Sequence, residues 1–180
     1  MLKEIKIKGY KSIKDITLDL KPINILIGAN GVGKSNFITF FSLVNNIYEQ
    51  NLQNYTMACG ADSLLYYGLK HTNFIEGSLD FGNNTYSFKL APARDGSLYI
   101  SEESNIFINS RWIYPTKNIR ESKIKDSSRP RDSFLRNFLA SYRIYHFHDT
   151  EMNSKLRSKY CNIDDNERFA VDGSNLPAFL

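Results

Sequence analysis

The segment from Gly28 to Ser35 has residue types and a spacing that fit the binding of phosphate groups. It reads Gly-Ala-Asn-Gly-Val-Gly-Lys-Ser and matches the P-loop pattern G-x-x-x-x-G-K-[ST] at every fixed position. The glycines let the backbone curl until successive amides point at phosphate oxygens. Lys34 can reach the outer phosphates of ATP, and the Ser35 hydroxyl can ligate Mg²⁺. The predicted ATP-binding residues are Gly28, Ala29, Asn30, Gly31, Val32, Gly33, Lys34, Ser35 and Asn36.

The flanking segments supply the context that such a loop needs. Residues 23–27 are β-branched and nearly continuously apolar, which predicts a strand buried on both faces. Residues 34–48 carry apolar side chains around most of a helical circumference, which predicts a buried helix. A chance match in a turn is the alternative, and the strand and helix on either side argue against it.

The remaining pattern predicts an α/β fold. Strand-like alternation occurs at 2–8 and 15–20, and residues 74–108 resemble an antiparallel β-meander with turns at 82–84 and 94–96. Residues 49–73 are predicted to be mainly loop, with a short helix near 61–68. The other expected elements are a basic loop and a helix within 111–143, a buried strand at 143–147 and a helix cap at 172–176.

Hydrolysis of ATP needs more than a P-loop. This class of enzyme uses an apolar strand that ends in Asp-Glu, and no such run occurs in the sequence. Asp80 is followed by Phe and Gly, and Asp149 is separated from Glu151 by a threonine. A Leu-Ser-Gly-Gly-like signature is also missing. The sequence therefore supports nucleotide binding more strongly than turnover by this chain alone.

Positive charge is concentrated in one stretch of a chain whose net charge is +4. Residues 111–143 contain nine basic and three acidic residues, a net charge of +6. Such a stretch can attract a phosphate backbone, although a solvated loop and helix face is the simpler interpretation. The candidate nucleic-acid contacts are Lys123, Lys125, Arg129 and Arg131.

Several weaker candidates have plain structural alternatives. His146 and His148 could share one face of a strand as a metal pair, but we favour core or edge histidines. Asp149 is interpreted as a turn residue rather than a partner of Mg²⁺. Trp112 and Tyr114 could stack on a base, and packing under the basic loop is favoured. Lys11 and Lys14 lie between the first two strands, where adenine or phosphate would fit or where they are simply exposed turn lysines.

Cysteine content and the lack of targeting segments indicate the cellular compartment. The two cysteines, Cys59 and Cys161, lack CxxC partners, which excludes a disulfide framework and favours reduced, partly buried thiols. The N-terminus carries no signal peptide, and no apolar stretch is long enough to span a membrane. We therefore expect a cytoplasmic protein with no membrane partner.

Three stretches resemble a known group of ATPases. Residues 7–13 (Ile-Lys-Gly-Tyr-Lys-Ser-Ile), 23–28 and 31–36 resemble the opening of ATP-binding-cassette-class proteins related to the structural-maintenance-of-chromosomes, RecF and overcoming-lysogenization-defect (OLD) ATPases. Residues 144–150 and 172–176 are similar to predicted AAA-type ATPases from bacterial genomes and defence loci.

The resemblance implies an N-terminal lobe over residues 1–180, with parallel or mixed core strands, and a C-terminal lobe that is absent. It also implies head-to-tail homodimers around two ATP molecules, and DNA or nuclease partners. Hydrolysis is then expected only of a complete protein. A truncated, non-hydrolytic nucleotide-binding or interaction module is the alternative, and an ABC transporter subunit fits less well because of the residues at 9–13 and the meander.

Overall fold

The computed structural model describes residues 1–108, 110–114, 119–145 and 175. The chain divides into two compact units, Met1–Ser141 and Tyr142–Leu180. The described residues of the second unit are 142–145 and 175, so the fold described below is that of the first unit. Residues 143–145, where a strand is predicted, are not in a strand, and the rest of that prediction and the cap at 172–176 lie outside the described residues.

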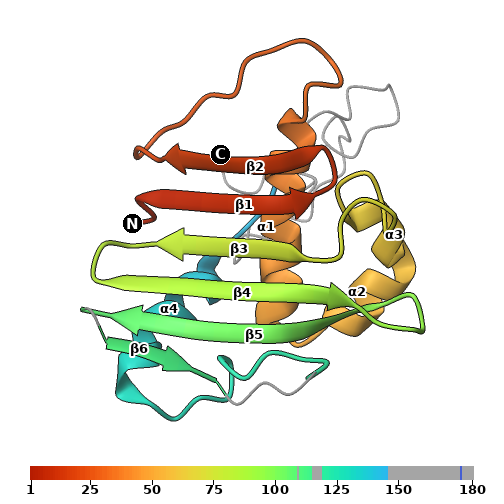
Figure 1. The fold of residues 1–180 in the computed structure, drawn as a ribbon. Helices are drawn as coiled ribbons and strands as arrows, with labels where there is room; N and C mark the ends of the chain where they lie inside the picture. The colour runs from red at the N-terminus through yellow and green to blue at the C-terminus, as the bar shows by residue number, and fades with distance from the viewer. Residues whose placement is uncertain (109, 115–118, 146–174, 176–180) are drawn as a thin grey trace. The chain divides into compact units, whose positions relative to one another are not determined.

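A six-stranded sheet forms the centre of the first unit (Figure 1). Its order is β2-β1-β3-β4-β5-β6, and every neighbouring pair is antiparallel. The strands are β1 (Glu4–Tyr10), β2 (Ile13–Asp19), β3 (Ile75–Asp80), β4 (Asn84–Pro92), β5 (Leu98–Phe107) and β6 (Ser110–Ile113). The predicted meander corresponds to β3, β4 and β5. The predicted parallel core strands are not found in the described part of the chain.

Helices α1 (Lys34–Tyr48) and α4 (Ser133–Ser141) lie behind one face of this sheet in Figure 1. The shorter α2 (Leu52–Cys59) and α3 (Ala61–Leu64) follow α1 in the chain, and the 3-10 turn η1 (Pro130–Asp132) precedes α4. In the described residues no helix is both long and apolar enough to cross a membrane.

Strict alternation along the central strands produces the core. Ile5 and Ile7 are fully buried, and Lys6 and Lys8 between and after them are exposed. Phe40 of α1 is fully buried and meets the sheet through Phe88, with ring centroids 6.0 Å apart and nearly parallel. Its edge also contacts Tyr10 at 5.4 Å. This aromatic cluster holds the helix that follows the P-loop against the sheet.

Gly77 makes room for that cluster. A Cβ at this position would lie 2.3 Å from Cζ of Phe88 and 2.8 Å from Cζ of Phe40. Both rings are buried, so neither can move away freely. The glycine in the middle of β3 is therefore required by close packing between strand and helix.

The strand predicted at 23–27 is the main disagreement with the sequence analysis. These residues form no strand, and Ile23, Ile25 and Ile27 are 82%, 78% and 89% exposed. A buried strand needs hydrogen-bonding neighbours, and none of the described strands pairs with this segment. The apolar pattern indicates a preference for burial, but it does not show which strand would pair with this segment.

Helix α2 was expected to be loop, and it is held by a residue far along the chain. The Glu121 carboxylate accepts hydrogen bonds from the amides of Leu52 and Gln53, at 2.9 and 3.0 Å. The residue that precedes the helix, Asn51, makes no capping bond with its side chain. Cys59 at the end of this helix is exposed, so the expected partial burial of its thiol is wrong.

A buried carboxyl group on β5 is covered by the segment that contains Ser122 and Lys123. Glu103 is fully buried and accepts hydrogen bonds from the Tyr86 hydroxyl at 2.7 Å, the Lys123 amide at 2.9 Å and the Ser122 hydroxyl. Burial raises the pKa of Glu103, and the hydrogen bonds only partly oppose this rise.

This pKa shift predicts a pH-dependent stability. An acid whose pKa is raised in the folded state stabilises the fold below its unfolded pKa, and that contribution is lost as pH rises through the folded pKa. Glu103→Gln, which cannot ionise, should therefore gain stability relative to the parent as pH increases from about 4 to 8. Urea unfolding at several pH values measures this difference. A difference that does not change with pH would contradict the assignment.

Candidate functional site

The predicted phosphate-binding loop is exposed and ends on the first turn of α1. Gly31 and Gly33 have φ angles of 86° and 101°, in the left-handed region that glycine tolerates. Nothing lies within 4 Å of a Cβ built on Gly31. The structure therefore brings residues 28–36 together as one open loop and helix start.

The first turn of α1 carries no acidic side chain that would compete with a bound anion. The helix begins at Lys34, contains 15 residues, has no acidic residue in its first turn and no side-chain cap. The first amides of a helix have no partner within the helix and carry a partial positive charge. A phosphate group would satisfy these amides, and Ser35, exposed on the same turn, offers its hydroxyl to Mg²⁺.

Lys34 is folded back over its own loop. Its Nζ donates to the carbonyl oxygens of Gly28 and Ala29, both at 2.6 Å. Both carbonyls belong to exposed residues of the loop. To bind a phosphate, the ammonium exchanges neutral carbonyl acceptors for charged oxygens, which form stronger hydrogen bonds.

The turn between β1 and β2 supports the start of α1. Asn36 donates from Nδ2 to the Ser12 hydroxyl at 2.8 Å, and that hydroxyl lies 2.9 Å from where a Gly33 Cβ would be. Lys11 donates from Nζ to the Thr39 hydroxyl at 3.4 Å. Of the two lysines singled out in the sequence, the structure therefore brings Lys11 to the P-loop helix, whereas Lys14 is exposed on β2.

A hollow of about 580 Å³ opens beside this turn. Asn36 from α1 and Lys11 and Ser12 from the β1–β2 turn line one part of it. Asp62 and Tyr67, from α3 and the turn after it, line the other part. Sequence reasoning missed this second wall because residues 61–68 carry no motif.

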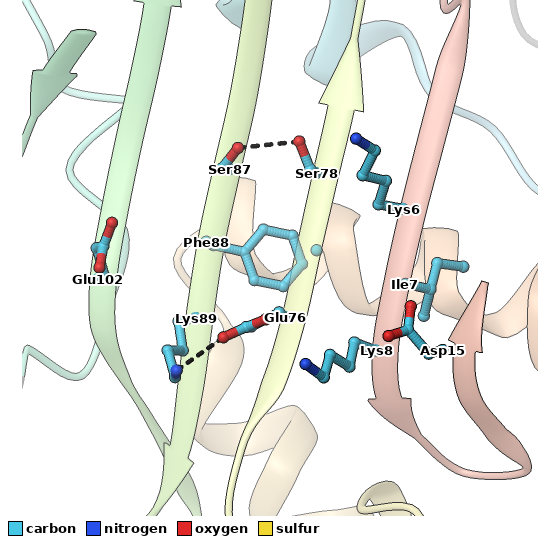
Figure 2. Close-up of a pocket in the computed structure, with 11 residues that line it drawn as sticks. Lys6, Ile7, Lys8, Asp15, Glu76, Ser78, Ser87, Phe88, Lys89 and Glu102 are labelled. Carbon is cyan, nitrogen blue, oxygen red and sulfur yellow. Dashed lines mark hydrogen bonds and ion pairs between the residues drawn. The ribbon is translucent and has the colours of Figure 1, made fainter. Parts of the chain in front are cut away.

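A second hollow, of about 450 Å³, lies on the outer face of the sheet (Figure 2). The strand register places Asp15, Lys8, Glu76, Lys89 and Glu102 in one row across five strands. Negative and positive side chains alternate along this row, and Lys89 pairs with Glu76 at 2.7 Å. Because each lysine is flanked by carboxylates, this face has little attraction for a polyphosphate.

The basic stretch is more neutral in space than along the chain. Lys125 pairs with Glu49 at 2.6 Å, and Arg129 lies 3.8 Å from the buried carboxylate of Asp132. Arg131 lies over the ring of Phe107, 5.5 Å from its centroid, and Lys123 is exposed. The four candidate nucleic-acid contacts are therefore not equivalent.

The structure describes some of the candidate stacking and metal-binding residues. Tyr114 is 3% exposed, which confirms packing rather than stacking on a base. The Trp112 side chain and residues 146–149, with His146, His148 and Asp149, lie outside the described part of the chain. Within that part, no group of three or more His, Cys, Asp or Glu residues could hold a metal ion.

A comparison with protein families identifies the chain. The family model described as AAA ATPase domain matches residues 1–174. The chain belongs to the AAA ATPase domain family. None of the curated proteins matches it significantly. Membership of this family supports nucleotide binding, in agreement with the open glycine loop of this AAA ATPase domain.

Proposed function

We propose that this AAA ATPase domain binds ATP and Mg²⁺ at residues 28–36. The observation that carries the proposal is the open loop with left-handed Gly31 and Gly33, joined to a helix N-terminus that has no acid and no cap. The loop and helix amides would hold the phosphates, Lys34 would move from the loop carbonyls to the outer phosphates, and Ser35 would ligate Mg²⁺. Bound Mg²⁺ would neutralise phosphate charge.

Thermal unfolding tests this proposal. A ligand that binds only the folded chain raises its midpoint, by an amount that grows with ligand concentration. ATP with Mg²⁺ should raise the midpoint, and AMP should raise it much less because it lacks the outer phosphates. Equal midpoints with ATP, AMP and no nucleotide would exclude the site.

We propose further that this chain binds ATP without sustained turnover. The sequence offers no Asp-Glu strand end and no signature motif, so an acid that activates water is missing from its motifs. The proposed relationship to the structural-maintenance-of-chromosomes, RecF and OLD ATPases would supply these groups from a second lobe and a head-to-tail partner. Phosphate release that requires Mg²⁺ and is lost in Lys34→Ala would contradict this proposal.

The alternative, a purely non-hydrolytic interaction module, predicts no turnover in any longer protein.

A DNA partner is a separate proposal, supported by the exposure of Lys123 and Arg131. Reversing both charges with Lys123→Glu and Arg131→Glu should weaken duplex DNA binding and make the negative slope of log affinity against log salt shallower by about two. Lys6→Glu combined with Lys8→Glu is the matched control, since both lysines are exposed on the outer face of the sheet and the change in net charge is the same. Unchanged retention of the double variant in a filter-binding titration would remove DNA as a partner of this surface.

A further inference from the structure

The hollow beside the P-loop has the composition of a site for a flat, polar ring. Tyr67 is 73% exposed there, so most of its side chain is free to contact a ligand. Lys11 and Ser12 line the same hollow, as does Asn36 in the first turn of α1. The hollow therefore reaches Asn36, the last residue of the segment that is proposed to hold the phosphates.

Tyr67 is held in place despite its exposure. Its ring meets that of Tyr66 edge-on, with centroids 4.5 Å apart. The Tyr66 amide donates to the Gly9 carbonyl at 3.0 Å, and the Thr72 hydroxyl donates to the Tyr66 carbonyl at 2.7 Å. The Tyr66–Tyr67 segment is thus hydrogen-bonded to β1, the strand that leads directly into the Lys11–Ser12 turn.

The turn around Tyr67 is anchored by Asp62. The carboxylate accepts a hydrogen bond from the Leu69 amide at 2.8 Å. A Cβ on Gly68 would lie 2.6 Å from the same oxygen, so this glycine permits the close approach. Tyr67 itself has a φ of 52°, which is costly for a bulky residue and is maintained only where the surroundings fix it.

We propose that this hollow binds the base and ribose of the nucleotide, with the base stacked on Tyr67. The inference rests on the proposed binding of ATP at residues 28–36 and adds the residue that recognises the base. Stacking on an aromatic side chain uses the π-face that every base has, and a preset ring loses little freedom on binding. Lys11 lines the same hollow and donates to the Thr39 hydroxyl of α1, so its ammonium would offset negative charge near the ribose.

The test compares ATP with inorganic tripolyphosphate, each with Mg²⁺, by equilibrium binding to the whole chain. Tyr67→Ala should weaken ATP binding by about 5- to 100-fold and leave tripolyphosphate binding unchanged. Tyr67→Phe should keep the affinity for ATP, because it retains the ring. Leu69→Ala, at a residue of the same turn that is 47% exposed, is the matched control and should also keep it.

The outcomes separate the two proposals. If the parent binds neither ATP nor tripolyphosphate, the phosphate site itself is wrong. If the parent binds both and Tyr67→Ala binds ATP as tightly as the parent, the phosphate site stands and the base site is overturned. An equal loss of both ligands in Tyr67→Ala would also overturn the base site, since it would show a general disturbance of the loop.

Discussion

Lys34→Ala should weaken the binding of ATP with Mg²⁺ by about 10- to 100-fold, because hydrogen bonds to charged groups contribute roughly 1.5–3 kcal/mol. The fold should be unaffected. Among the described residues, the Lys34 ammonium bonds to two carbonyls of exposed loop residues, and water can replace it there. Fluorescence titration with a labelled ATP analogue measures the affinity, and urea unfolding measures the stability.

Lys6→Ala is the matched control for this loss. Lys6 is also an exposed lysine, but it lies on the outer face of β1 and pairs with Glu4 at 3.2 Å. Its removal lowers the net charge by the same amount and should leave nucleotide affinity within about twofold, since exposed ion pairs contribute little. If the two variants lose affinity equally, the effect is one of overall charge, and the assignment of Lys34 is wrong.

Phe40→Ala should lower the free energy of unfolding by about 3–5 kcal/mol. Phe40 is fully buried and contacts Tyr10, Phe41 and Phe88 through its ring. Gly77 on β3 has no side chain to fill the space that the ring leaves, so removal of the ring creates a cavity. Because this ring joins α1 to the sheet, we also expect ATP affinity to fall once the helix loosens. Urea denaturation with both far-UV and near-UV detection measures the change.

Ile38→Ala offers a control on the same helix. Ile38 is 42% exposed, two residues before Phe40, and its truncation should cost less than about 1 kcal/mol. Similar losses of unfolding free energy in the two variants would mean that Phe40 does not pack α1 against the sheet. The difference between them reports directly on the packing of the helix that follows the P-loop.

Local signals in the sequence predicted much of the described fold. The alternation of Ile5 and Ile7 with lysines gave the correct faces of β1, and turn residues at 82–84 and 94–96 separated the strands of the meander. Helix α1 covers the predicted range, 34–48, because its start is determined by the glycine loop and its apolar residues recur around the helix. These features depend on residues that are near one another in the chain.

The failures depend on partners distant in sequence. Helix α2 takes its cap from Glu121, which no reading of residues 49–59 could reveal. The apolar run at 23–27 satisfies the pattern of a buried strand, but pairing depends on a neighbour that the pattern does not name. The hollow at Tyr67 arises because Tyr66 is bonded to Gly9, 57 positions earlier in the chain. Charge counted along 111–143 overstated the basic surface for the same reason, since Glu49 and Asp95 neutralise Lys125 and Arg120.

Isothermal calorimetry of ATP with Mg²⁺ on the folded parent chain tests the central claim most directly. Binding of the triphosphate by the amides of residues 28–36 predicts saturable heat with one site per chain, and no such heat when Mg²⁺ is injected alone. The protein in the cell should first show a cooperative unfolding transition, so that an inactive sample is recognised. Heat no greater than that of dilution, from material that passes this check, would contradict the claim.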